Sequence, residues 1–241
     1  MKRSERHHLK DNELVSLAEN AREAFEANKK QSVALVAAVA IIAVAAAGLF
    51  GWRARVQGQS HSMLAQALAV VDASVGPLPS PDSKGPAPRF RTEAQRSEAA
   101  LAKLREVADA YPSTDAGLYA RYLQGNTLVA LGKPADAVKA YQQVVDRDSK
   151  GLTGQMARLG LAEAQARTGQ FDQAIATFKQ LAQQKEGAMP VDAVLMELGR
   201  VYRDAGKPSD AQQTFSRVVE EFPQSPFSAD AKRELDNLKK S

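Results

Sequence analysis

Cysteine is absent from the 241-residue sequence, which excludes disulfide bonds and thiol chemistry. Histidine is scarce as well: the three histidines are His7, His8 and His61, and all of them precede the repeated part of the chain described below. His7 and His8 lie together in a charged segment, which is more typical of a solvated tail than of a metal site. We therefore expect no catalytic residues, no metal and no cofactor, and hence no enzyme.

A strong charge bias is also missing. The chain has 32 Lys and Arg residues against 28 Asp and Glu residues, a net charge of +4, and only 6% of its residues are aromatic. No basic stripe alternates with aromatic residues, so nucleic-acid binding is not indicated. The glycines of "GLTGQMARLG", which begins at residue 151, have no P-loop lysine. We therefore expect neither a nucleic-acid partner nor a small-molecule substrate.

One long run of apolar residues is present. Residues 33–52, "VALVAAVAIIAVAAAGLFGW", contain no charge, and as a helix they are long enough to cross about 30 Å of hydrocarbon. A cleaved signal peptide is the alternative, but its apolar part is about 7–15 residues long and follows a short basic start. Here 32 residues precede the run. The sequence thus favours an uncleaved, single-pass transmembrane helix at 33–52.

The regions flanking this run differ in composition. Before it, residues 11–30 have the spacing of an amphipathic helix within an N-terminal segment at 1–32. This helix either lies on the membrane or a membrane partner, or is a solvated extension of the span. After it, residues 53–91 contain a predicted membrane-proximal helix and a proline-rich loop at 77–88. That helix is a candidate partner for a helix at 92–110, which together would form a divergent first repeat.

The remaining sequence repeats with a period of 37 residues, which is typical of stacked repeat architectures. "GKPADAVKAYQQVV" begins at Gly132, "GQFDQAIATFKQLA" at Gly169 and "GKPSDAQQTFSRVV" at Gly206. Each unit places a glycine, an alanine and an aromatic residue at fixed offsets. The alanines are Ala137, Ala174 and Ala211, and the aromatic residues are Tyr141, Phe178 and Phe215.

These residue types suit a helical hairpin. The glycine favours a left-handed helix C-cap, and a proline follows it where a new helix accepts a residue without an N–H. Small residues 12 positions apart, such as Gly199 and Ala211, are predicted to face each other where the two helices cross. The aromatic residue lies one turn beyond the alanine and is predicted to wedge into the next unit.

With these features the sequence resembles the tetratricopeptide repeat family. The best unit, "ELGRVYRDAGKPSDAQQTFSRVVEEFP", has the small residues, the aromatic residue and the closing proline of the family pattern. The resemblance implies an all-α fold, in which a transmembrane helix precedes a right-handed solenoid of helical hairpins. Three repeats are clear and a first one is divergent, so the repeat domain is expected at 92–241, with a capping helix at its C-terminal end.

The family resemblance also implies a concave protein-binding surface lined by the first helix of each hairpin. The alternative is that these positions are simply exposed helix residues. The carboxylate clamp by which some family members grip acidic C-termini is missing, since only Asn126 matches it. The residues at inward-facing positions are Tyr119, Tyr122, Asn126, Met156, Leu159, Glu163, Arg167, Met196, Arg200 and Arg203.

An anchor followed by such repeats is similar to the family of ancillary SecYEG translocon subunits, and the repeats alone to the periplasmic cell division coordinators of the Tol-Pal system. This implies a bacterial inner-membrane protein with a cytoplasmic N-terminus and a periplasmic repeat domain. Basic residues favour this orientation only slightly, since Arg22, Lys29 and Lys30 precede the span and Arg53 and Arg55 follow it. The expected function is a scaffold that binds other proteins, above all an integral membrane complex such as the translocon. A holdase for unfolded or newly translocated chains is the alternative.

Overall fold

The computed structural model describes residues 29–76, 89–183 and 189–240. The chain divides into two compact units, Met1–Val56 and Gln57–Ser241, which we describe separately. The predicted N-terminal amphipathic helix, up to residue 28, lies outside the described residues, and so does the proline-rich loop at 77–88. The described residues form nine helices and two very short strands.

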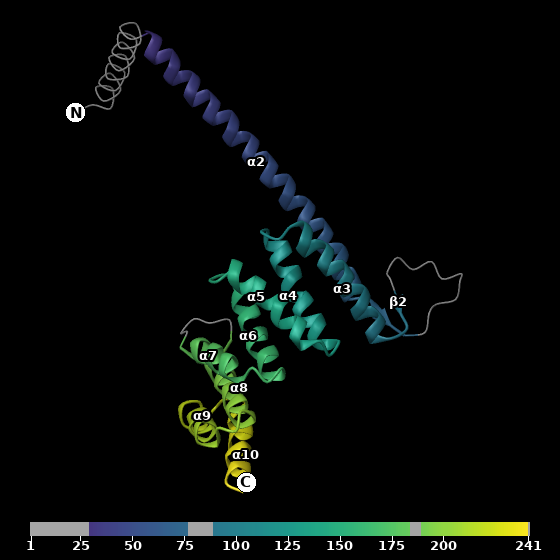
Figure 1. The fold of residues 1–241 in the computed structure, drawn as a ribbon, viewed down its shortest axis with the longest axis vertical. Helices are drawn as coiled ribbons and strands as arrows, with labels where there is room; N and C mark the ends of the chain where they lie inside the picture. The colour runs from purple at the N-terminus through teal and green to yellow at the C-terminus, as the bar shows by residue number, and fades with distance from the viewer. Residues whose placement is uncertain (1–28, 77–88, 184–188, 241) are drawn as a thin grey trace, which may run out of the picture. The chain divides into compact units, whose positions relative to one another are not determined.

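The first described helix, α2, runs from Lys29 to Val71 (Figure 1). It is continuous through the apolar run and the predicted membrane-proximal helix, because no proline interrupts it and its isolated glycines cost only about 1 kcal/mol each. Its apolar side chains between residues 33 and 52 are exposed; Ile41 and Val44, for example, are 69% and 73% exposed. The stretch Val33–Val71 is long and apolar enough to span a membrane.

In the second unit, the C-terminal end of α2 forms the first helix of a divergent repeat. Leu64 and Ala67 are buried in one cluster with Leu104 and Val107 of α3, which runs from Glu93 to Ala110. The Thr92 side chain caps α3 by accepting a hydrogen bond from a backbone N–H. Between α2 and α3, strand β1 (Ser74–Val75) pairs in parallel with strand β2 (Arg89–Phe90), a feature that the sequence does not predict.

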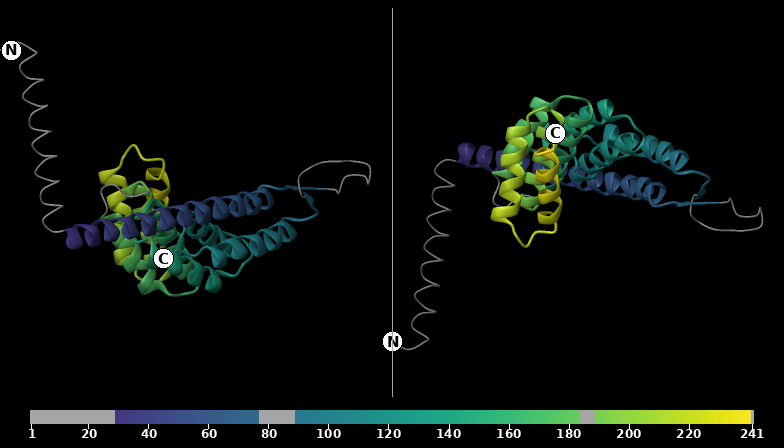
Figure 2. Two further views of the ribbon diagram at one scale, coloured as in Figure 1. Left: turned by 90° about the horizontal axis from the view of Figure 1, so that it is seen from above. Right: turned by 90° about the horizontal axis from the view of Figure 1, so that it is seen from below.

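Three helical hairpins and a final helix follow, and each helix packs against the next along the chain (Figures 1 and 2). The last helix packs against α9. This all-α repeat architecture confirms the predicted fold class. The hairpins are α4 (Asp115–Ala130) with α5 (Pro134–Arg147), α6 (Leu152–Arg167) with α7 (Phe171–Ala182), and α8 (Val191–Asp204) with α9 (Pro208–Glu221), and the last helix is α10 (Ser228–Leu238).

The turn within each hairpin has the same geometry. Gly132, Gly169 and Gly206 have φ angles of 70°, 75° and 69°, the left-handed region that favours glycine. In each turn the following residue donates its backbone N–H to a carbonyl five residues earlier, at 2.8, 2.9 and 2.9 Å. This is the hydrogen bond of a Schellman C-cap. The recurrence of one turn geometry every 37 residues confirms the register read from the sequence.

The aromatic residue of the first clear repeat is held between two helices. A Cβ atom placed on Gly125 of α4 would lie 2.4 Å from the Tyr141 ring, and one on Gly160 of α6 would lie 2.7 Å from it. Tyr141 therefore wedges into the next unit, as predicted. In the last hairpin, a Cβ atom placed on Gly199 of α8 would lie 2.5 Å from the Phe215 ring of α9. An aromatic ring fills the space above this glycine, which is why a larger residue does not fit there.

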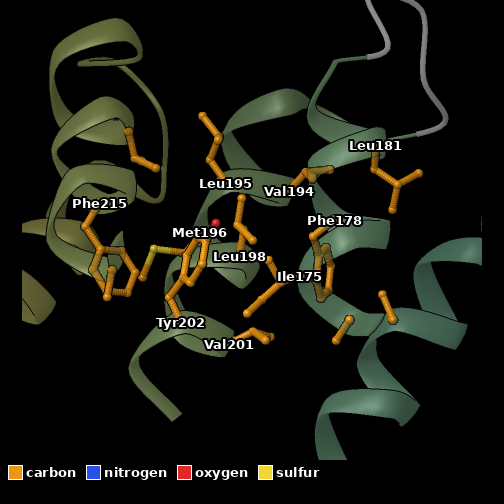
Figure 3. Packing of buried hydrophobic residues seen from close by; sticks show 14 of the residues in the cluster. Ile175, Phe178, Leu181, Val194, Leu195, Met196, Leu198, Val201, Tyr202 and Phe215 are labelled. Atoms are coloured by element: carbon orange, nitrogen blue, oxygen red, sulfur yellow. The ribbon is translucent and has the colours of Figure 1, made fainter. Parts of the chain in front are cut away.

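The largest apolar cluster spans α6 to α10 (Figure 3). Phe178 of α7 and Phe215 of α9 are completely buried in it. Leu195 and Met196 of α8 are also completely buried, and they join the two hairpins into one core. Because each hairpin covers the apolar face of its neighbour, the first helices α4, α6 and α8 have fixed relative positions within this unit.

Candidate protein-binding surface

The predicted binding residues lie on the first helix of each hairpin and recur with the repeat. Position by position, Tyr122, Leu159 and Met196 form one series at intervals of 37 residues. Asn126, Glu163 and Arg200 form a second series. We call the surface formed by the predicted residues of α4, α6 and α8 the first-helix surface. Its chemistry changes from aromatic on α4 to charged on α6 and α8.

The aromatic end is a group of three tyrosines. The rings of Tyr119 and Tyr122 on α4 stack with their centroids 6.0 Å apart, and Tyr122 is 6.1 Å from Tyr141 of α5. The Tyr141 hydroxyl donates a hydrogen bond of 2.6 Å to Oδ1 of Asn126. Burial, followed by the nearby Tyr122 and Glu163, raises the pKa of Tyr141, so its hydroxyl remains a hydrogen-bond donor. Tyr119 and Tyr122 are only half-buried and remain available to a partner.

The charged end contains a hollow of about 410 Å³ between α6 and α8. Four predicted residues, two from each helix, come together in its lining with additional acidic and apolar side chains. The predicted residues are Glu163, Arg167, Arg200 and Arg203, and the others are Ala166, Phe178, Glu197, Val201 and Asp204. The hollow therefore combines three guanidinium groups, three carboxylates and an apolar part.

Most charges in this hollow already have partners. Arg200 forms an ion pair of 2.5 Å with Glu197, one turn earlier on α8. Arg203 binds both carboxylate oxygens of Glu234 on α10, at 2.8 and 2.7 Å. Glu163 and Arg167 are the exceptions, because within the described part of the chain neither forms a hydrogen bond or an ion pair. Burial, and then the neighbouring Glu197, raise the pKa of the Glu163 carboxyl, while Arg167 opposes this shift.

Met196 requires a correction. It is predicted to lie on the binding surface, but its side chain is completely buried in the cluster of α6 to α10 (Figure 3). Leu159, the residue one repeat earlier, packs against the same cluster and is only partly buried. Met196 therefore stabilises the packing of neighbouring hairpins and is not available to a ligand. Met156 on α6 remains partly exposed.

Two residues that line the hollow were not among the predicted residues, Glu197 and Asp204. The sequence offered a signal for Glu197, since it lies three residues before Arg200, the spacing of an ion pair on one helix face. Tyr141 is 2% exposed and packs beneath the half-buried Tyr122, in agreement with the packing role predicted for it.

The fold defines a class of protein: a helical-repeat protein built of stacked hairpins, a class that generally binds other proteins. A family model described as "Tetratricopeptide repeat-like domain" matches residues 19–240. The chain therefore belongs to the tetratricopeptide repeat-like family. Folds of this type are typically non-catalytic scaffolds. Among the described residues, no group of three or more His, Cys, Asp or Glu side chains is arranged to hold a metal ion.

Solved structures support the same fold. One contains nearly identical TPR-like repeats from Podosopora anserina and is 20% identical, with a TM-score of 0.53 over 61% of this chain and 79% of that one. Another is a tetratricopeptide repeat protein from Parabacteroides merdae, 14% identical, with a TM-score of 0.55 over 75% of this chain and 60% of that one. Among curated proteins, no sequence matches this chain.

Proposed function

We propose that this protein is a membrane-anchored interaction scaffold of the bacterial inner membrane, ancillary to the protein secretion or envelope machinery. The observation that carries the proposal is the exposure of the apolar residues of α2. Leu35, Ile42 and Phe50 are 66–72% exposed, and no other described part of the chain covers them. Burial of such surface in lipid is favourable by roughly 25 cal/mol per Å², so a bilayer is the environment that suits this helix.

The extent of the family match supports the proposal that the apolar helix is retained in the mature protein. The match begins at residue 19, before the apolar run, and continues to residue 240. The apolar helix is therefore included in the region that resembles other family members. A cleaved signal peptide would not be expected within the body of a mature domain, so this range favours an uncleaved span.

The proposed orientation places residue 1 in the cytoplasm and the repeats in the periplasm. The absence of cysteine permits a direct test, because a single introduced cysteine is the only thiol in the chain. A cysteine in the 77–88 loop is expected to react with a membrane-impermeant thiol reagent in spheroplasts. A cysteine at Lys10 is expected to be protected until the membrane is opened. The reverse pattern would show that the orientation is wrong.

The proposed partner is an integral membrane complex, with the translocon as the first candidate. One membrane helix would hold the repeats close to the bilayer, where their effective concentration toward other membrane proteins reaches roughly millimolar values. Weak contacts on the first-helix surface are then sufficient for capture. The anchor is then as important for binding as the surface itself.

Copurification from native membranes tests the scaffold. The full-length protein is expected to recover a membrane complex, and a soluble periplasmic form without residues 1–52 is expected to lose most of it. Replacing Tyr122 and Arg200 by alanine should weaken recovery without changing helix content, because both side chains are only partly buried. The holdase is favoured instead if the soluble form binds unfolded chains as well as the anchored form does and no membrane complex is recovered.

A further inference from the structure

The α6–α8 hollow contains one carboxylate that is unfavourably placed. Glu163 is half-buried and lies near a second carboxylate, Glu197, on the adjacent repeat. Two of the three guanidinium groups in the lining are engaged elsewhere, Arg200 by Glu197 and Arg203 by Glu234. Arg167, one turn later on α6, partly offsets the effect of burial on Glu163 but forms no ion pair with it. A carboxylate that loses water without gaining a partner reduces the stability of the fold. Such a group is suited to a cation supplied by another molecule.

We infer that this hollow receives a lysine or arginine side chain from the bound partner, with Glu163 as the carboxylate that pairs with it. The inference rests on the proposed scaffold function and adds the chemistry of the partner segment. The incoming cation would lie between Glu163 and Glu197 and would reduce their mutual repulsion. Its methylene stem would pack against the apolar part of the lining, supplied by Ala166 and Val201.

A cation fits the hollow better than an anion does. Arg167 is the guanidinium in the lining with no ion pair among the described residues, but it is exposed and therefore already well solvated. Pairing an anion with an exposed guanidinium contributes little, about 0–1 kcal/mol. Pairing a cation with half-buried Glu163 satisfies a group that has already lost part of its water. The larger gain therefore comes from a basic side chain.

The test uses the full-length protein in lipid nanodiscs and four peptides that differ at one position. The peptides are N-acetyl-Ala-Ser-X-Ser-Ala-amides with lysine, arginine, norleucine or glutamate at X. Calorimetric titrations up to millimolar peptide are expected to show that the lysine or arginine peptide binds about tenfold or more tightly than the norleucine peptide. Norleucine is the matched control because it keeps the methylene stem and lacks the charge.

Two substitutions identify the carboxylate. Glu163→Gln should remove the preference for the basic peptide, while Glu220→Gln, at an exposed position on α9, should leave it unchanged. Circular dichroism of both variants establishes that helix content is retained. Equal binding of all four peptides, tighter binding of the glutamate peptide, or equal effects of the two substitutions would overturn the inference.

These outcomes are separate from those of the scaffold proposal. If the membrane complex still copurifies but the peptides bind equally, the cation site is wrong and the scaffold stands. If the basic peptide binds through Glu163 but no membrane complex is recovered, the site stands and the scaffold role is wrong. A preference between the lysine and arginine peptides decides which cation the hollow accommodates better.

Discussion

The apolar part of α2 and the helices of the repeats use similar residues in opposite ways. In the repeats, Ala137, Ala174 and Ala211 are completely buried, because neighbouring helices approach closely there. In α2, Val39 and Phe50 are 59% and 72% exposed although they are larger and more apolar. Helix propensity is adequate in both regions, so it does not explain the difference. The difference is whether other described parts of the chain cover the apolar face, and the exposed face of α2 is compatible with the proposed membrane span.

The largest expected effect is on the stability of the repeats. It is measured by making the same phenylalanine-to-alanine change in each of the two regions. Phe178→Ala removes a completely buried ring from the core between hairpins and should destabilise the repeats by about 3–5 kcal/mol. Phe50→Ala removes an exposed ring from α2 and should leave the unfolding of the repeats unchanged. Urea unfolding of the detergent-solubilised chain, followed by circular dichroism, measures both. Similar losses at the two positions would mean that α2 belongs to the packed core.

A charged residue introduced into α2 tests whether this helix is surrounded by lipid. Ile42 is 66% exposed, so an arginine at this position creates no clash with the protein. In a bilayer, Ile42→Arg should oppose insertion by about 2.5–3.5 kcal/mol. Alkaline extraction of membranes is expected to release a larger fraction of this variant, whereas Gln212→Arg on the exposed face of α9 serves as the control. Unchanged membrane association of both variants would contradict the proposed span.

The sequence predicted those features that follow from residue types recurring at fixed offsets in each repeat. The glycine series predicted three left-handed turns, and the aromatic series predicted the wedge made by Tyr141, because both follow from local geometry repeated at a fixed period. The short β1–β2 pairing was not predictable, since two-residue strands carry no periodic signal. Continuity of α2 beyond the apolar run was missed because composition changes there while helix propensity does not.

The binding surface was predicted less well for a physical reason. A family position specifies the direction of a side chain relative to its own helix, but burial depends on how closely the next hairpin approaches. Met196 and Tyr122 occupy equivalent positions, yet the first is buried in the core and the second is half-exposed. Likewise, Glu163 and Glu197 belong to two different repeats and come close only when the repeats stack. The spacing of residues within one unit therefore predicts neither the burial of Met196 nor the proximity of these two carboxylates.

A glycine in a hairpin turn and a glycine within α2 should respond in opposite ways to substitution by alanine. Gly132 has φ of 70°, and a Cβ atom added to it would have no other atom within 4 Å, so Gly132→Ala introduces backbone strain without a steric clash. The expected cost is about 1–2 kcal/mol. Gly58 lies within helix α2 and also has open space around it. Gly58→Ala should therefore stabilise by about 0.5–1 kcal/mol. Thermal melts of the two variants should shift in opposite directions, and shifts of the same sign would contradict the assigned backbone conformations.

The smallest expected effect concerns the cost of keeping Glu163 charged when no partner is bound. The groups around it are Arg167 on its own helix, Tyr141 on α5, and Glu197 with Arg200 on α8. Burial and Glu197 raise the pKa of Glu163 in the folded chain. Below the ordinary glutamic acid pKa the carboxyl is neutral in both states and costs nothing. As the pH rises through that value, the unfolded chain loses the proton first, and the cost is complete above the raised folded pKa.

Glu163→Gln should therefore stabilise the repeats at neutral pH and lose this advantage in acid, where wild type and variant should unfold together. Urea unfolding at several pH values between neutral and acidic conditions measures the difference, with Glu220→Gln as the reference for a surface carboxylate. Addition of the lysine peptide should reduce the advantage of the variant at neutral pH, because the cation stabilises the wild-type carboxylate and has no charged partner in the variant. A stabilisation that persists unchanged in acid would show that the carboxylate charge is not its cause.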